Sequence, residues 1–158
     1  MKKLTMVLAI AAMSMLLVGS AYAQPNTATQ TFNLAVSSIY KIAVSGSPAD
    51  MIITDAVPGS DPTPVTNSAT TYSITHNDAD GAKITASLAP ALAAGYTLTI
   101  ALAGNAPVDI STATQNAVGN VARGASTGNT IAYNFSATAA AGPLASVGET
   151  VTLTVVGL

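Results

Sequence analysis

The 158-residue chain contains no cysteine and no tryptophan, and only 8% of its residues are charged. Without cysteine it forms no disulfide and offers no thiolate to a metal or a substrate. With a single histidine it also lacks the several nitrogen ligands that zinc-type sites use. The sequence therefore predicts a fold that is held together by side-chain packing and strand pairing alone.

The first 23 residues have the three parts of a secretory signal peptide. Lys2 and Lys3 precede an uncharged, mostly apolar run at 4–18, and the small-residue site Ala21-Tyr22-Ala23 follows it. The run is short for a membrane span of about 30 Å. We therefore expect cleavage after Ala23. Residues 24–158 then form a single domain that is exported to the periplasm, the outer surface or the extracellular space.

The remaining charges are few and mostly acidic. After residue 23 the chain keeps three basic and seven acidic residues, a formal charge of −4. Because no basic patch exists, nucleic acid is not expected as a partner, and no later run is apolar enough to span a membrane. A surface of threonine, serine, asparagine and alanine gives little electrostatic protection against self-association. This composition is expected of a subunit that assembles with copies of itself, and it is also common in exported bacterial proteins that stay monomeric.

Alternation of apolar and polar residues is the strongest pattern in the chain. It is clearest at 96–102, where Tyr96, Leu98, Ile100 and Leu102 fall on one face and Thr97, Thr99 and Ala101 on the other. A period of two predicts a β-strand with one buried face, and β-branched threonines favour a strand on the other face as well. This segment is therefore expected to be a central strand of the domain.

Weaker copies of the pattern occupy most of the chain after residue 30. Further strands are expected at 31–37 continued by 40–44 as two parts of one kinked strand, and at 51–54, 70–76, 83–88, 108–111, 118–123, 129–138 and 149–156. The runs at 70–76 and 83–88 flank strong turn residues at 77–81 and are expected to pair as a hairpin. With glycine, proline and asparagine between the runs and no long helical pattern, the fold expected is all-β. It is an antiparallel β-sandwich, immunoglobulin-like or pilin-like, with seven to nine short strands.

The two ends of the expected domain carry short alternating segments. One is Thr31-Phe32-Asn33-Leu34-Ala35-Val36, and the other is Gly148-Glu149-Thr150-Val151-Thr152-Leu153-Thr154-Val155. At these ends the chain resembles secreted pilin-like sandwiches of the spore coat protein U and archaic chaperone–usher type. The resemblance implies surface fibres or coats, in which a strand from a neighbouring subunit completes an incomplete sandwich.

Two hypotheses fit residues 24–37. In the first, 29–37 is a donor strand that places Phe32, Leu34 and Val36 into an apolar groove of a neighbouring copy. In the second, it is the first strand of its own domain. The first hypothesis leads to the function that we favour from the sequence: a non-enzymatic, exported structural protein of the bacterial cell surface. It would self-associate through strand pairing into a fibre or coat.

The most site-like cluster is His76-Asn77-Asp78-Ala79-Asp80-Gly81. Asp78 and Asp80 alternate before a glycine and offer oxygen ligands of the kind that Ca²⁺ prefers. The competing interpretation is a turn whose Asp and Asn side chains bond their own backbone. No other cofactor is indicated. This cluster supports the alternative function, a monomeric periplasmic or extracellular binding module for glycan or Ca²⁺.

No catalytic constellation is visible in the sequence. His76 is the only histidine, and no serine lies in a G-x-S-x-G context. No pair of carboxylates can be assigned to opposite walls of a cleft, as a glycosidase would need. We therefore expect a protein that is not an enzyme, in which His76 ends a strand and has an ordinary surface role.

Overall fold

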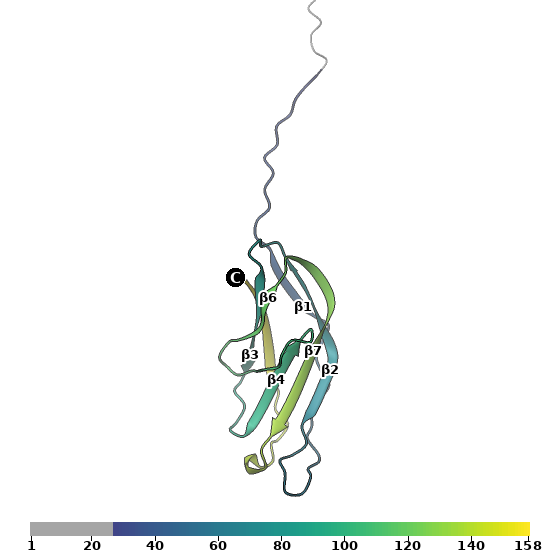
Figure 1. The fold of residues 1–158 in the computed structure, drawn as a ribbon, viewed down its shortest axis with the longest axis vertical. Helices are drawn as coiled ribbons and strands as arrows, with labels where there is room; N and C mark the ends of the chain where they lie inside the picture. The colour runs from purple at the N-terminus through teal and green to yellow at the C-terminus, as the bar shows by residue number, and fades with distance from the viewer. Residues whose placement is uncertain (1–26) are drawn as a thin grey trace, which may run out of the picture. The chain divides into compact units, whose positions relative to one another are not determined.

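The computed structural model describes residues 27–158, and their strands form two antiparallel sheets (Figure 1). The predicted signal peptide at 1–23 lies outside the described residues. The elements are β1 (Tyr40–Val44), β2 (Val65–His76), β3 (Ala82–Ala89), β4 (Tyr96–Leu102), β5 (Val108–Asp109), β6 (Gln115–Val121), β7 (Gly124–Ala137), the 3₁₀-helix η1 (Ala139–Ala141) and β8 (Thr150–Gly157). The expected all-β antiparallel sandwich of seven to nine strands is confirmed. No helix among these residues is long and apolar enough to cross a membrane.

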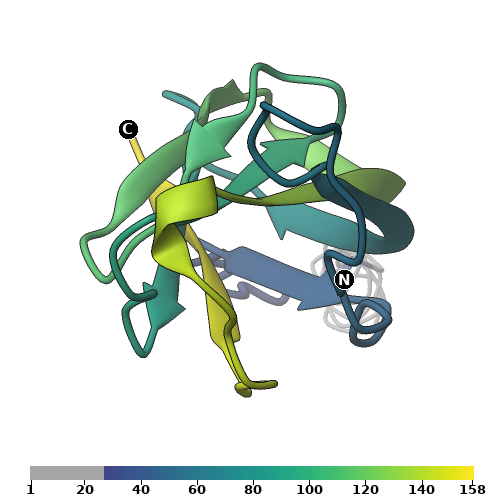
Figure 2. The same ribbon diagram turned by 90° about the horizontal axis from the view of Figure 1, so that it is seen from below.

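The two sheets differ in size and share no strand. The larger has the order β1-β2-β7-β4-β5, and the smaller has the order β6-β3-β8. Every strand pair is antiparallel. Figure 2 shows the strands from the end of the domain that carries η1. The edge strands are therefore β1 and β5 in one sheet and β6 and β8 in the other.

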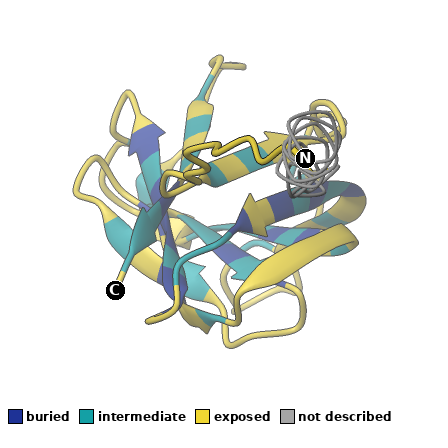
Figure 3. Ribbon diagram, turned by 90° about the horizontal axis from the view of Figure 1, so that it is seen from above, coloured by how far each residue is buried: buried dark blue, intermediate teal, exposed yellow. Residues whose placement is uncertain are grey.

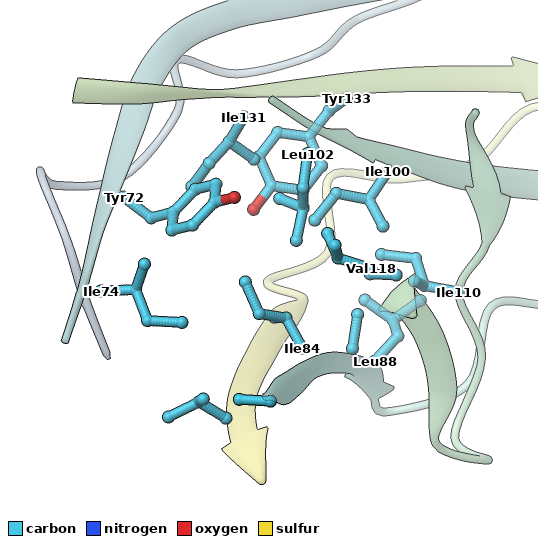
Figure 4. Packing of buried hydrophobic residues seen from close by; sticks show 14 residues of the cluster. Tyr72, Ile74, Ile84, Leu88, Ile100, Leu102, Ile110, Val118, Ile131 and Tyr133 are labelled. Carbon is cyan, nitrogen blue, oxygen red and sulfur yellow. The ribbon is translucent and has the colours of Figure 1, made fainter. Parts of the chain in front are cut away.

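The core forms where the alternating residues of the two sheets face each other. Buried and more exposed residues take turns along the strands, as a period of two requires (Figure 3). Ile84 and Leu88 of β3 pack opposite Ile100 and Leu102 of β4, with Ile131 of β7 beside them (Figure 4). All five side chains are almost completely buried. Aliphatic packing between the sheets thus stabilises a domain that has no disulfide.

The expected hairpin of 70–76 with 83–88 is wrong. β2 pairs with β1 and β7, whereas β3 pairs with β6 and β8. The loop at 77–81 therefore carries the chain from one sheet to the other. Turn residues report that the chain reverses locally, but the partner of a strand depends on which apolar face must cover which. Placing β2 and β3 in opposite layers lets their buried faces cover each other.

Several other segments differ from the pattern-based expectation. No strand forms within residues 27–39, so the strand expected at 31–37 is absent, and the segment at 51–54 is an irregular loop. β7 begins at Gly124, five residues before the expected start, and β6 covers 115–121 instead of 118–123. The short edge strand near residue 108 is confirmed. Alternation gives a segment the capacity to pair, but a strand forms only where a neighbour supplies the ladder.

We expect Leu102→Ala to lower the free energy of unfolding by about 2–5 kcal/mol, because Leu102 is fully buried and its truncation leaves a cavity. Thr97→Ala, on the exposed face of the same strand, is the matched control and should change stability by less than about 0.5 kcal/mol. Urea unfolding followed by circular dichroism measures both. Equal losses for the two variants would contradict the assignment of the β4 faces.

Candidate functional site

A short segment after β5 closes one side of the sandwich. The N–H of Ile110 donates to the carbonyl of Leu98 in the larger sheet (2.9 Å). The carbonyl of Ser111 accepts from the N–H of Leu88 in the smaller sheet (2.8 Å). The Ile110 side chain between them is only 5% exposed. One stretch of chain thus bonds to both sheets and fills the space between their edges.

The opposite side is closed only at one end, where β1 meets β8. The Tyr40 hydroxyl donates a hydrogen bond to Asp78 Oδ2. Gly157 packs directly against this pair, since a Cβ on Gly157 would lie 2.6 Å from Tyr40 Oη and 3.0 Å from Asp78 Oδ2. We call Tyr40, Asp78 and Gly157 the latch. It brings the first residue of β1 and the last residue of β8 together.

Away from the latch, an apolar groove of about 1080 Å³ opens between the two sheets. Its lining includes inward-facing side chains of β1, β4, β7 and β8, among them Ile42, Tyr96, Leu98, Phe135, Val151 and Leu153. The loops at 46–53 and 142–148 border it and carry the exposed apolar side chains of Ile52, Leu144 and Val147. The groove therefore exposes a face that would be core in a complete sandwich.

Burial decreases along the strands toward this groove. On β4, Leu102 and Ile100 are buried, whereas Leu98 and Tyr96 are only half-buried. On β8, Val155 is buried, whereas Leu153 and Val151 are half-buried. Alternate residues of a strand point to the same face, so the face does not change along either strand. Burial decreases along both strands because fewer residues of the opposite layer cover their ends beside the groove.

The backbone along the groove is also incompletely paired. β8 pairs with β3 along one edge, and no strand within residues 27–158 pairs with its other edge. Two residues that line the groove, Thr70 and Glu149, each have a buried side-chain oxygen without a hydrogen-bond partner among the described residues. An added strand would supply backbone N–H and C=O partners to the unpaired edge of β8 and apolar side chains to the groove.

The three predicted donor side chains are all exposed in the single copy. Phe32 is 70% exposed, Leu34 is 93% exposed and Val36 is 81% exposed, and none of them lies in a strand. They are among the largest exposed apolar residues of the described chain. Among residues 27–158, the structure thus contains an exposed apolar segment and an apolar groove that no strand covers.

The Asp78–Asp80 loop has the internal bonds of a turn. Asp78 Oδ1 accepts the N–H of Asp80 (3.1 Å), and Asp78 Oδ2 accepts the Tyr40 hydroxyl. Both carboxylate oxygens of Asp78 are therefore engaged within the protein. Among the described residues, no group of three or more His, Asp or Glu side chains could hold a metal ion. A Ca²⁺ site at Asp78 and Asp80 stays a prediction from the sequence.

The expected surface role of His76 is wrong, because the side chain is only 2% exposed. Its ring stacks on Tyr40 with 6.4 Å between centroids and 3° between planes. Its Nε2–H donates to the carbonyl of Ala122 at 2.8 Å, and Nδ1 has no partner within residues 27–158. His76 thus packs beneath the latch, and its single hydrogen bond to a backbone carbonyl does not orient it as a base toward a nucleophile.

The latch hydrogen bond shifts the pKa values of both its partners. Donation from the Tyr40 hydroxyl is the largest cause that lowers the pKa of Asp78 below its ordinary value, and the backbone N–H of Asp80 adds to it. The same bond is the largest cause that raises the pKa of Tyr40. Elsewhere, burial raises the pKa values of Tyr72 and Tyr133. The charged form of Asp78 is therefore the form that the fold prefers.

The sequence singled out the apolar alternation of 29–37, whose side chains the structure leaves exposed, but it did not reveal the groove. It placed Leu98, Val151 and Leu153 in alternating segments, and in the structure each of them is partly buried, whereas the threonines at 97, 152 and 154 are exposed. Periodicity does not report strand order, however. No signal in the sequence therefore showed that β1 and β8 are edge strands that lie near each other without pairing. The groove became visible only when the two sheets were in place.

We expect Asp78→Asn to lower the free energy of unfolding at pH 7, because the folded state favours the Asp78 carboxylate. This contribution is present above the unfolded pKa of about 3.9 and disappears as the pH falls through the lower folded pKa. The difference between wild type and variant should therefore shrink below about pH 4. Urea unfolding across pH 2.5–7 would measure it, because this range extends about 1.4 units below the unfolded pKa of about 3.9.

Tyr40→Phe is the second variant of a double-mutant cycle, because it removes only the hydroxyl that donates to Asp78. The losses from Tyr40→Phe and Asp78→Asn should not fully add in the double variant, since Asp78→Asn removes the charge of the group that accepts the Tyr40 hydroxyl, and Tyr40→Phe removes that hydroxyl. Additive losses, or a difference that is constant with pH, would contradict the latch.

Comparison of the chain with protein-family models gave no match, and comparisons with curated proteins and with solved structures gave none either. The likeness to subunits of the spore coat protein U and chaperone–usher type therefore stays a prediction from the two ends of the chain.

Proposed function

We propose that this protein is an exported structural subunit of the bacterial cell surface, and that copies of it join by β-strand addition. The observation that carries the proposal is the apolar groove beside the unpaired edge of β8. The donor is the segment 29–37, whose alternating apolar side chains are exposed in the single copy. Assembly of this kind needs no catalytic group and no cofactor.

The donor and the groove agree in length. The groove follows the chain of β8 and the residue before it from Glu149 to Leu153, a stretch of five residues. The donor side chains Phe32, Leu34 and Val36 also span five residues, which is about 14 Å in an extended strand. The latch closes the groove beyond this stretch, where Val155 is already buried. Three alternate side chains therefore fit the open part of the groove.

The match in length gives a register for the added strand. Leu34 is central in the donor and lies opposite Val151, which is central in the groove, while Phe32 and Val36 occupy the two ends. We expect the donor to run antiparallel to β8, as every described strand pair does, because antiparallel pairing is the more stable form. Phe32 then lies beside Leu153, and Val36 lies beside Glu149.

Burial of the donor side chains supplies most of the affinity. Each of the three contributes about 1.5–3 kcal/mol when it is fully buried, and the backbone ladder with β8 fixes the register. No charged side chain of the donor takes part, because residues 29–37 carry none. Assembly should therefore depend little on ionic strength.

We expect the triple variant Phe32→Ser, Leu34→Ser, Val36→Ser to remain monomeric at concentrations where the wild-type protein forms fibres or oligomers. The matched control is Asn33→Ser with Ala35→Ser, which alters the opposite face of the same segment and should assemble like wild type. Light scattering after size-exclusion chromatography gives the mass, and negative-stain microscopy shows the polymer. Wild-type protein that stays monomeric, with the thermal stability of the triple variant, would overturn the proposal.

The register can be tested directly because the chain has no natural cysteine. We expect Leu34→Cys protein to form a disulfide-linked dimer when it is mixed with Val151→Cys protein under oxidising conditions, since directly opposed strand residues suit disulfide geometry. Thr152→Cys is the control, because Thr152 is next in sequence but exposed on the outer face. Equal dimer yields for Val151→Cys and Thr152→Cys on a non-reducing gel would contradict the register.

A further inference from the structure

We propose that Asn77 determines which copy receives the donor strand: it prevents the segment 29–37 from filling the groove of its own chain and so commits it to a second copy. This inference rests on the proposed function, because it concerns the occupant of the same groove. It is carried by three hydrogen bonds at the start of β1 and by the number of residues between the donor and β1.

Asn77 holds the residues that connect the donor segment to β1. Its Oδ1 accepts the N–H of Ile39 (2.7 Å), and its Nδ2 donates to the carbonyl of Ser37 (2.9 Å). Its backbone N–H also donates to the carbonyl of Ile39 (3.3 Å). Asn77 follows the last residue of β2, so these bonds prolong the β1–β2 ladder by one step. We call Asn77 with Ser37 and Ile39 the clamp.

The clamp holds the chain on the edge of β1 that faces away from the groove. β2 pairs with one edge of β1, and the groove borders the other edge. Ser37–Ile39 therefore continue β1 in line, beside the loop that follows β2. A donor strand that enters its own groove has to leave this line and turn back along β1.

Insertion into the same chain in the antiparallel register is excluded by length. Val36 would lie beside Glu149, eight residue steps from Gly157, which is about 27 Å along an extended strand. Gly157 packs against Tyr40, so the chain would need to cover this distance between Val36 and Tyr40. Those two residues are four steps apart and reach at most about 14 Å.

Insertion into the same chain in the parallel register requires a reversal at Ser37–Ile39. Val36 would lie beside Leu153, four steps from Gly157, so the distance to Tyr40 can be covered. The inserted strand would then run antiparallel to β1. Ser37–Ile39, the only residues between the inserted strand and β1, would have to form the turn. These are the residues that the clamp bonds to Asn77 beside the end of β2. Asn77 is thus a positioning residue that blocks the one route to self-insertion.

The test uses secreted protein that carries both Leu34→Cys and Val151→Cys, because residues 34 and 151 are central and meet in either orientation. Oxidation at low protein concentration gives a disulfide within one chain if the donor fills its own groove, and a disulfide between chains if it fills another. A non-reducing gel separates the two products. With Asn77 present, we expect the bond to form between chains.

We expect Asn77→Ala to raise the ratio of intrachain to interchain disulfide by about tenfold, as the loss of two ordinary side-chain hydrogen bonds allows. Asn77→Asp keeps Oδ1 but places an oxygen opposite the Ser37 carbonyl, and it should give a smaller shift in the same direction. Because Asp is nearly isosteric with Asn, Asn77→Asp can also be used for this test if Asn77→Ala does not fold. Asn105→Ala is the matched control, because Asn105 Nδ2 likewise bonds a backbone carbonyl, that of Leu102, at 2.7 Å. It should leave the ratio unchanged.

The outcomes separate this inference from the proposed function. The same ratio for the Leu34→Cys, Val151→Cys protein with Asn77 and for both Asn77 variants of it, with interchain bonds throughout, would overturn the role of the clamp and keep strand addition. Mainly intrachain bonds with Asn77 present would also overturn it. Folded variants that form no 34–151 disulfide of either kind would overturn strand addition itself.

Discussion

Each sheet of this protein buries its apolar face only because the other sheet covers it, and this cover is complete on one side alone. On the closed side, Ile110 and Ser111 bond to both sheets and fill the space between them. On the other side, β1 and β8 meet at the latch and then border a groove. In a domain without disulfides, this packing is the main source of stability, so an unfilled groove is a site where further burial is favourable.

The loop between β2 and β3 controls both ends of the proposed assembly. Asn77 holds the residues through which the donor segment leaves β1, and Asp78 holds Tyr40 against the end of β8. The first interaction determines where the donor is free to go, and the second determines how far along β8 a groove is available. Two residues of the sequence that resembles a calcium loop, Asn77 and Asp78, therefore have structural partners within the fold.

The sparse charge of the chain is consistent with this way of joining. The donor segment carries no charge, and the groove is lined mainly by aliphatic and aromatic side chains. Recognition then depends on the alternation of side chains and on the unpaired edge of β8. Both are features of strand geometry, so the same physical rule that builds the sandwich within one copy is proposed to join one copy to the next.

The sequence by itself determined the all-β class, the inward face of most strands and the apolar alternation of Phe32, Leu34 and Val36. It did so because a period of two is a local property that each strand carries alone. Only the tertiary structure decided that 70–76 and 83–88 lie in different sheets and that His76 is buried. It also decided that β1 and β8 enclose a groove. These features depend on which strands become neighbours, and that choice is made by the packing of whole apolar faces against one another rather than by any short stretch of residues.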